Sequence, residues 1–386
     1  MNLVSFALSM NFDEKEKGTS GGDRILVNFI KRLINKDINI YIYTTKEGYM
    51  QLKYYNVPSS LIQVIPTKFN SWVFKEIERV FKSISLGIRF KTEQPIILYS
   101  ASNFIADILS AFLIKFRARN KAKWVVGFWM FPPSPFSKGF PYKGKYAIRG
   151  ILYFLNVYLP FLACYRLVDG FWVTNPVDMR IISSIYGVDS SKILVVKGGV
   201  DKASCLESIS KVYDAIFVGR LHPQKGVLQL IDIWQIVCKE KPYAKLVIVG
   251  VGPLYEDLRK KIRRLNLQDN IYLVGFKDGQ EKMQVIANSK IFLHPVIYDS
   301  GGMAAAEAMV CGLPCVTFDL PTIREYYAYG CIRIKPYDLK AFAAAILNLL
   351  NDQILYQNLS KEAKEYCEKW DWSYRAKEAL EFLRGI

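Results

Sequence analysis

Short apolar runs of strand length alternate with helical patterns along almost the whole chain. In the first half, the segments that we expect to form strands are Leu3–Ser9, Ile38–Thr44, Leu61–Ile65, Ile96–Tyr99, Trp124–Phe128 and Gly170–Thr174. Between the first two, Arg24–Ile34 places its apolar residues at helical spacing. In the second half, the expected strands are Ala215–Gly219, Leu246–Gly250, Ile271–Gly275, Ile291–His294, Cys315–Phe318 and Ile332–Ile334. This alternation predicts α/β structure, in which helices cover both faces of a parallel sheet.

Two such series predict two doubly wound domains, and 386 residues are enough to give each its own core. The apolar pattern breaks over residues 198–212, so we expect an N-terminal domain at 1–200 and a C-terminal domain at 201–369. Met1–Met10 lacks the basic leader and cleavage site of a signal peptide and is expected to form a strand. The seven cysteines are scattered and form no CxxC pair, so we expect reduced thiols in a cytosolic protein.

Two stretches depart from the simple alternation. Phe131–Lys145 is rich in proline, glycine and aromatic residues and is expected to be a loop. Ile151–Cys164 is almost wholly apolar but short for a membrane span, and Asn156 and Pro160 interrupt it. We favour a buried helix there over insertion into a membrane.

The net charge of +17 is concentrated in the first half, where residues 1–200 carry 27 Lys and Arg but only 13 Asp and Glu. Between Asp107 and Asp169 there is no acidic residue, and the basic residues are Lys115, Arg117, Arg119, Lys121, Lys123, Lys138, Lys143, Lys145, Arg149 and Arg166. Such a field attracts anionic membranes or nucleic acids, although a solvated basic surface would look the same in composition.

A glycine turn marks the first candidate site. The segment Tyr298–Met309 follows an expected strand, contains Gly301 and Gly302, and then becomes good helix-forming sequence. A helix that begins there presents free N–H groups and its positive dipole end, which together bind anions, and the glycines let a ligand approach the backbone. Glu307 lies about one turn inside, where its carboxylate could accept hydrogen bonds from the hydroxyls of a ribose. The alternative is a plain strand–turn–helix joint with a surface glutamate.

A basic pair marks the second candidate site. Arg220 follows the first strand of the second half, and Lys225 is expected to start the next helix. Ligands of open α/β sheets bind at the carboxyl ends of strands, and two cations there suit a diphosphate. The alternative is a loop with solvated basic residues.

The order of several motifs resembles that of the retaining glycosyltransferases of family four, the group 1 glycosyltransferases. These motifs are GRLHPQKG, VIVGVGPLYEDL, NIYLVGF and the acidic-x7-Glu segment from Asp299 to Glu307. Fainter likenesses are Gly21–Arg24, Gly198–Asp201 and Trp370–Ser373. The resemblance is specific in residues 214–320 and weak in 45–165. It implies the GT-B fold, two Rossmann-like domains facing across a cleft, with a C-terminal helix at 370–386 that crosses back to the first domain.

The resemblance also implies roles for individual residues. Arg220, Lys225 and Asp299 would be catalytic: the two cations hold the donor diphosphate, and Asp299 touches the sugar or its diphosphate. Glu307 would bind the ribose, Gly22 would let the first domain close on the donor, and the backbone near Phe276 and Lys277 would bind the base. The full donor-binding set that it implies is Gly22, Gly219, Phe276, Gly301, Gly302, Met303, Ala304 and Glu307. The implied substrate is a UDP- or GDP-sugar, with no metal and no other cofactor, because the cations and the helix dipole carry the electrostatic stabilisation.

The chain departs from the family pattern at two points. Asp299 stands where relatives usually have glutamate, and Val126–Met130 contains no histidine where many relatives have one that contacts the sugar. The only histidines are His222 and His294, which we interpret as structural or solvated.

The expected reaction is transfer of a sugar with retention, by front-side attack in which the donor phosphate helps to take the acceptor's proton. The basic and aromatic first domain favours an acceptor that is anionic and partly apolar, such as a lipid-linked sugar or glycan. We therefore expect a cytoplasmic protein bound peripherally to the anionic inner face of the membrane through residues 115–166.

Alternatives are a non-catalytic sugar-nucleotide-binding protein, a sugar-nucleotide epimerase or a phosphorylase of the same fold. We do not expect a nucleic-acid partner, because no known nucleic-acid-binding motif is present.

Overall fold

A computed structural model describes residues 1–12, 18–34, 36–69, 71–137, 139–201, 205 and 210–386. Lys138 and part of the expected interdomain segment, residues 202–204 and 206–209, therefore lie outside the described residues. The chain divides into two compact units. Unit 1 comprises Met1–Lys197 and Trp372–Ile386, and unit 2 comprises Gly198–Asp371.

Unit 1 is built on a seven-stranded parallel sheet with the strand order β3-β2-β1-β4-β5-β6-β7. The strands are β1 (Asn2–Ala7), β2 (Asn39–Thr44), β3 (Ile62–Val64), β4 (Ile96–Ser100), β5 (Ala122–Phe128), β6 (Gly170–Val173) and β7 (Ile193–Val195). Nearly every residue of β1, β4, β5 and β6 is buried, as expected for parallel strands that are covered on both faces.

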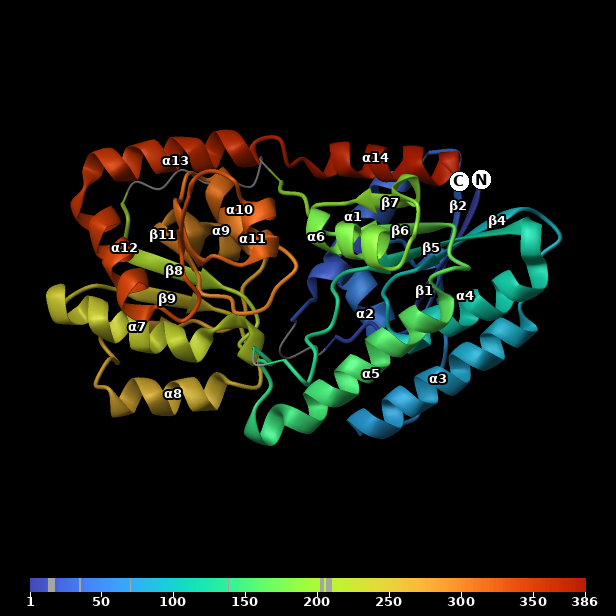
Figure 1. Ribbon diagram of the computed structural model, residues 1–386, viewed down its shortest axis with the longest axis horizontal. Coiled ribbons are helices and arrows are strands. Elements are labelled where there is room, and N and C mark those ends of the chain that lie inside the picture. The colour runs from blue at the N-terminus through green and yellow to red at the C-terminus, as the bar shows by residue number, and fades with distance from the viewer. Residues whose placement is uncertain (13–17, 35, 70, 138, 202–204, 206–209) are drawn as a thin grey trace. The chain divides into compact units, whose positions relative to one another are not determined.

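Helices cover both faces of this sheet (Figure 1). They are α1 (Gly21–Leu33), α2 (Lys46–Tyr54), α3 (Trp72–Arg89), α4 (Ile105–Ala118), α5 (Ala147–Cys164), α6 (Pro176–Arg180) and α14 (Trp372–Gly385). The C-terminal α14 packs against α1, while α4 packs against β1, β4 and β5 and is itself contacted by α3 and α5.

Unit 2 is built on a six-stranded parallel sheet with the order β10-β9-β8-β11-β12-β13. The strands are β8 (Tyr213–Val218), β9 (Leu246–Val249), β10 (Ile271–Leu273), β11 (Ser289–His294), β12 (Cys315–Phe318) and β13 (Cys331–Ile334). The helices are α7 (Val227–Glu240), α8 (Tyr255–Arg264), α9 (Gly279–Ala287), α10 (Met303–Val310), α11 (Pro321–Tyr326), α12 (Leu339–Asn351) and α13 (Gln353–Cys367). Residues of α9, α10 and α13 share one apolar core with the sheet, and α7 packs against α8 and α12.

The strands predicted from the sequence are all present within a few residues of their expected bounds, and the doubly wound α/β class is confirmed. The short strand β7, Ile193–Val195, was not predicted from the sequence. Lys225 does not start a helix. It ends a 3-10 turn, Pro223–Lys225, and α7 begins two residues later.

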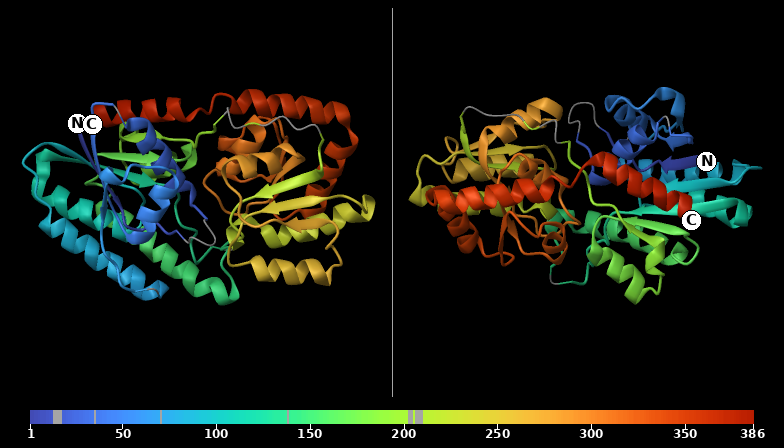
Figure 2. Two further views of the ribbon diagram at one scale, coloured as in Figure 1. Left: turned by 180° about the vertical axis from the view of Figure 1, so that it is seen from behind. Right: turned by 90° about the horizontal axis from the view of Figure 1, so that it is seen from above.

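The predicted buried helix at Ile151–Cys164 is a helix, but the expectation that it is buried is wrong. α5 is longer, it continues through Pro160, and only 28% of it is buried. Among the described residues, it is the one helix long and apolar enough to cross a membrane. Its outer face is a stripe of large apolar side chains, namely Ile148, Ile151, Leu152, Leu155, Leu159 and Leu162. α3 and α5 lie on the same side of unit 1 (Figures 1 and 2).

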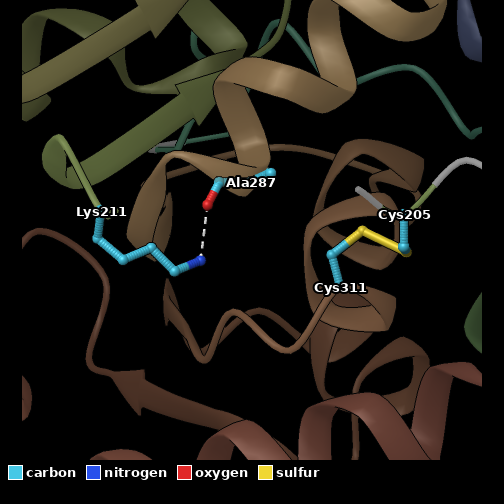
Figure 3. The surroundings of a disulfide bond; sticks show 4 residues. All are labelled: Cys205, Lys211, Ala287 and Cys311. Carbon is cyan, nitrogen blue, oxygen red and sulfur yellow. Dashed lines mark hydrogen bonds between the residues drawn. A yellow bond between two sulfur atoms is a disulfide. The ribbon is translucent and has the colours of Figure 1, made fainter. Parts of the chain in front are cut away.

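The expectation of seven reduced cysteines is also wrong for this structure. Cys205 and Cys311 form a disulfide, with their Cα atoms 5.4 Å apart, whereas the other five cysteines are free (Figure 3). The bond ties the start of unit 2 to the residue that follows α10. Nearby, the Lys211 ammonium donates to the carbonyl of Ala287, the last residue of α9, at 2.7 Å (Figure 3). The sequence could not predict the disulfide because 106 positions separate the two cysteines.

Candidate active site

The candidate residues of unit 2 gather where its strand order reverses. The chain runs from β8 outward through β9 and β10 and then returns to β11 on the other side of β8. Loops after β8 and β11 therefore leave the same edge of the sheet in diverging directions, and such a reversal is where doubly wound folds bind ligands. The β8 loop carries Gly219, Arg220 and Lys225, and the β11 loop carries Asp299 and the glycine turn.

The glycine turn is closely packed against the protein's own side chains. Gly302 precedes α10 with φ of 110°, a conformation that side chains rarely adopt. A Cβ on Gly302 would lie 2.5 Å from the imidazole of His294, and one on Gly301 would lie 2.5 Å from the ring of Tyr326. The sequence suggested that these glycines admit a ligand. The structure gives a second reason for them, because the protein itself fills the space where their side chains would lie.

A buried tyrosine secures the first turn of α10. The hydroxyl of Tyr327 donates to the carbonyl of Gly302 and accepts from the backbone N–H of Ala306 at 3.2 Å. Met303 and Ala304, the first two residues of the helix, are only partly buried. The first N–H groups of a helix have no partner within it, so this end of α10 is a positively polarised edge held in a fixed place.

Lys225 and Asp299 form an ion pair beside this edge. The Lys225 ammonium contacts Oδ2 of Asp299, while Oδ1 accepts from the backbone N–H of Ser300 at 2.9 Å. Burial alone would raise the pKa of Asp299, but Lys225, together with His294, outweighs it and holds the pKa well below its usual range. Asp299 is therefore ionised, and the structure places Lys225 against a carboxylate that the resemblance had assigned to the donor sugar or its diphosphate.

Both histidines lie at this site and stay neutral at neutral pH. Burial, with the charges of Arg220 and Lys225, lowers the pKa of His222 to about 3. Burial also lowers the pKa of His294, although Asp299 opposes the shift. Nε2 of His294 is 3.7 Å from Oδ2 of Asp299. Arg220, in the loop that follows β8, is exposed.

Glu307 lies on α10, about one turn inside the helix, and its carboxylate is already bound within the protein. Nζ of Lys282, on α9, lies 2.8 Å from both carboxylate oxygens of Glu307. Lys282 was not identified from the sequence, because nothing in a single chain shows which lysine of one helix meets a glutamate of another. Phe276 lies in the partly buried loop after β10, beside Lys277, whose ammonium is 3.2 Å from Glu281.

Gly22 belongs to unit 1, and there it makes room for a tryptophan. A Cβ on Gly22 would lie 2.4 Å from Nε1 of Trp129, and one on Gly127 would lie 2.5 Å from the same indole. The indole N–H donates to the carbonyl of Ala101 at 2.7 Å. Trp129 is thus the residue that fills the region where the resemblance would put a histidine, and its ring N–H is used inside the protein.

No group of three or more His, Cys, Asp and Glu side chains suited to a metal ion occurs among the residues that the structure describes.

Comparison with known proteins finds a family match over the same region. Residues 206–366 match the family model described as "Glycosyl transferases group 1". The chain is 26% identical over 240 residues to the poly(glycerol-phosphate) alpha-glucosyltransferase of Bacillus subtilis, covering 57% of this chain and 34% of that one. It is 27% identical over 265 residues to an uncharacterized glycosyltransferase of Methanocaldococcus jannaschii, covering 65% of this chain and 61% of the other. The chain thus spans less than two thirds of either relative.

Solved structures share the fold over the whole chain. Anabaena HepE, in complex with UDP and glucose, has a TM-score of 0.76 at 15% identity and covers 100% of this chain and 99% of its own. S. aureus TarM, whose complex contains Fondaparinux, alpha-GlcNAc-glycerol and UDP, has a TM-score of 0.74 at 13% identity, with 99% of both chains covered. The predicted GT-B fold class, with its two Rossmann-like units, is confirmed, and the sequence match supports the resemblance to group 1 glycosyltransferases.

Proposed function

We propose that this protein is a retaining glycosyltransferase that moves a sugar from a nucleoside-diphosphate sugar, either a UDP- or a GDP-sugar, to an acceptor. The observation that carries the proposal is the convergence at one sheet edge of the α10 N-terminus, Lys225 and Glu307. A polarised helix end and a cation suit a diphosphate, and a carboxylate one turn away suits a ribose diol. The names of the relatives point to the same class of reaction.

In this proposal, Arg220 and Lys225 neutralise the charge that develops on the leaving diphosphate, without a metal ion. The Lys225 ammonium is held by Asp299 in the structure. A diphosphate that reaches Lys225 would therefore meet a cation whose position is already fixed. Asp299 stays ionised and keeps the ammonium beside the helix end. The lowered pKa values of His222 and His294 make both imidazoles weak bases, which leaves the donor phosphate itself to help to remove the acceptor's proton.

The proposal is tested by measuring release of nucleoside diphosphate from a panel of UDP- and GDP-sugars, with total membrane lipid as the acceptor source. We expect lipid-dependent release that falls at least about a hundredfold in both Lys225→Met and Glu307→Ala, since each removes a charged contact from the donor site. Lys239→Met, an exposed change in the last turn of α7, is the matched control and should be silent. Equal rates in all four proteins would contradict the proposal.

A second candidate function is sugar-nucleotide binding without transfer. It is favoured by Trp129, which commits its ring N–H to Ala101 and has no second polar group to offer a substrate. Donor binding without turnover, whatever acceptor is supplied, would select this function.

We further propose that the acceptor is a lipid-linked sugar or glycan and that the protein acts in the cytoplasm, bound peripherally to the inner face of the membrane. The outer face of α5 supports this, because exposed cations flank its apolar stripe. Lys143 and Arg149 lie near one end and Arg166 lies at the other. Apolar faces flanked by basic residues bind at anionic lipid interfaces.

Part of the basic stretch at 115–166 has another role. Lys115 is paired with Asp169 at 2.7 Å, and Arg117 donates to the backbone carbonyl of Phe90, the residue that follows α3, at 3.1 Å. The proposed contact with lipid therefore rests on α5 and its flanks rather than on the whole stretch.

A further inference from the structure

Glu307 poses an electrostatic problem that the proposed function leaves open. Its carboxylate lies on the second turn of α10, the helix whose N-terminal end would hold a diphosphate. Two anions held close together in a partly buried site repel each other. A neighbouring group must offset the charge of Glu307 if this residue is to remain ionised and accept hydrogen bonds from a ribose.

Lys282 is placed to do this. It is the fourth residue of α9, and its side chain is 5% exposed. Its ammonium lies 2.8 Å from each oxygen of Glu307 and 3.3 Å from Oδ1 of Asp278. Asp278 precedes α9, so the ammonium is held between the beginning of one helix and the side of another.

We infer that Lys282 is a positioning residue for the donor: it fixes the Glu307 carboxylate in the orientation that binds the ribose hydroxyls and offsets its charge beside the diphosphate. This inference rests on the proposed function. A carboxylate has about four acceptor positions, so it can hold an ammonium along one edge and accept from a diol at the same time. Lys282 itself would touch neither the sugar nor the reacting atoms.

An ion pair that only stabilises the fold would show the same distances between Lys282 and Glu307. The test must therefore measure binding of the ribose hydroxyls. We would measure the affinity of the full-length protein for UDP and GDP and for their 2′,3′-dideoxy counterparts by calorimetry. The dideoxy nucleotides keep the diphosphate and the base but lack the diol. If Lys282 acts through Glu307 on the ribose, its removal weakens the nucleotides that have the diol more than those that lack it, because the latter lose only the charge offset beside the diphosphate.

In the wild type, we expect the ribonucleotide of the preferred base to bind about tenfold or more tightly than its dideoxy counterpart, as for the loss of hydrogen bonds to a charged group. In Lys282→Met, this ratio should fall towards one, because the affinity for the ribonucleotide drops further than that for the dideoxy nucleotide. Lys282→Arg should restore part of the ratio. Lys282→Gln, which keeps a hydrogen-bond donor at this position, gives a second measurement should the methionine variant be too unstable to purify.

Lys261 offers a matched control. Its ammonium is also partly buried and joins two helices of unit 2, through Asp232 at 2.6 Å and the carbonyl of Leu228 at 2.9 Å. Lys261→Met should destabilise the unit without changing the ratio of ribonucleotide to dideoxynucleotide affinity.

The outcomes separate this inference from the proposed function. Equal weakening of both nucleotide types by Lys282→Met would overturn the positioning role and leave the proposed function intact. So would a wild type that binds both types equally well. A wild type that binds no nucleoside diphosphate would overturn both.

Discussion

Gly302 shows how a single position can serve packing and ligand binding together. Its φ of 110° and the imidazole of His294 both exclude a side chain, while its carbonyl accepts from Tyr327. The turn before α10 is therefore fixed by buried side chains of β11 and of the residue that follows α11, and not by the glycines alone.

We predict that Gly302→Ala destabilises unit 2 by about 2–4 kcal/mol, because it combines backbone strain with a clash in the core. It should also abolish nucleoside-diphosphate binding, since the first turn of α10 moves. Gly279→Ala is the matched control: Gly279 also has positive φ, but a Cβ there would meet open space. Urea unfolding and calorimetry would check both effects, and equal losses in the two variants would contradict the role of His294.

Some site residues could be predicted from the sequence because their signal is local. Gly301 and Gly302 followed by helix-forming residues indicate a helix start, and α10 does begin at Met303. Lys282 and Tyr327 act through contacts between elements, and no spacing within one chain reveals such contacts. For the same reason, the sequence could not show that Asp299 would be paired with Lys225.

Among the elements, α5 is the one whose environment differs most from expectation. A run as apolar as Ile151–Cys164 is typical of a buried helix, and pattern alone does not distinguish this from a helix with one face in contact with lipid. Strand patterns were easier to interpret, because parallel strands covered on both faces are continuous apolar runs with sharp ends.

We predict that the double variant Leu155→Glu/Leu159→Glu loses binding to vesicles that contain anionic phosphatidylglycerol, by at least about tenfold. Each leucine contributes about 1.5–3 kcal/mol when fully buried from water, and a charge in its place opposes insertion. These side chains are 40% and 53% exposed in the structure, so folding should be retained. Ile354→Glu, on α13 of unit 2, is the control, with its isoleucine 73% exposed. Unchanged vesicle flotation of the double variant, or binding that raised salt does not weaken, would count against the membrane proposal.

The disulfide between Cys205 and Cys311 gives a second prediction at the scale of the elements, because it joins the start of unit 2 to the residue that follows α10. In oxidised protein, alkylation under non-reducing denaturing conditions should label five cysteines, and reduction should lower the stability of unit 2 by about 2–4 kcal/mol, as is typical for a bond that closes a long loop. Cys205→Ser should reproduce the effect of reduction, and Cys238→Ser should not. Seven labelled cysteines would show that the pair stays reduced, as the sequence had suggested.

At the scale of the whole molecule, the two units differ in which buried groups change protonation between pH 8 and pH 5.5. In unit 1, burial raises the pKa of Asp107 to about 7, although Ser102 and Ser9 donate to its carboxylate, and burial likewise raises that of Asp178 to about 7. In unit 2, burial lowers the pKa of both histidines of the chain. The buried carboxyls favour the protonated state and the buried histidines the deprotonated one, so both kinds of group are most stable when neutral.

We therefore predict that acidification from pH 8 to pH 5.5 stabilises unit 1 and destabilises unit 2. The folded pKa of each aspartate lies above its unfolded value, so its contribution is fully present below about pH 4 and is lost as the pH rises through 7. The folded pKa of each histidine lies below its unfolded value, so its contribution is present above about pH 6.5 and is lost as the pH falls. Over this interval, Asp107, Asp178 and His222 should each change the free energy of unfolding by about 1–2 kcal/mol, and His294 acts in the same direction as His222.

Hydrogen exchange followed by mass spectrometry measures each unit separately and would check this divergence. Asp107→Asn together with Asp178→Asn should remove the gain in unit 1 and leave the response of unit 2 unchanged, whereas His222→Gln should remove part of the loss in unit 2 and leave the response of unit 1 unchanged. Because the two responses have opposite signs, calorimetry of the wild type should show a total unfolding free energy that varies less with pH than the stability of the more responsive unit. Parallel changes in the protection of the two units would show that they unfold as one cooperative body, and would contradict the prediction.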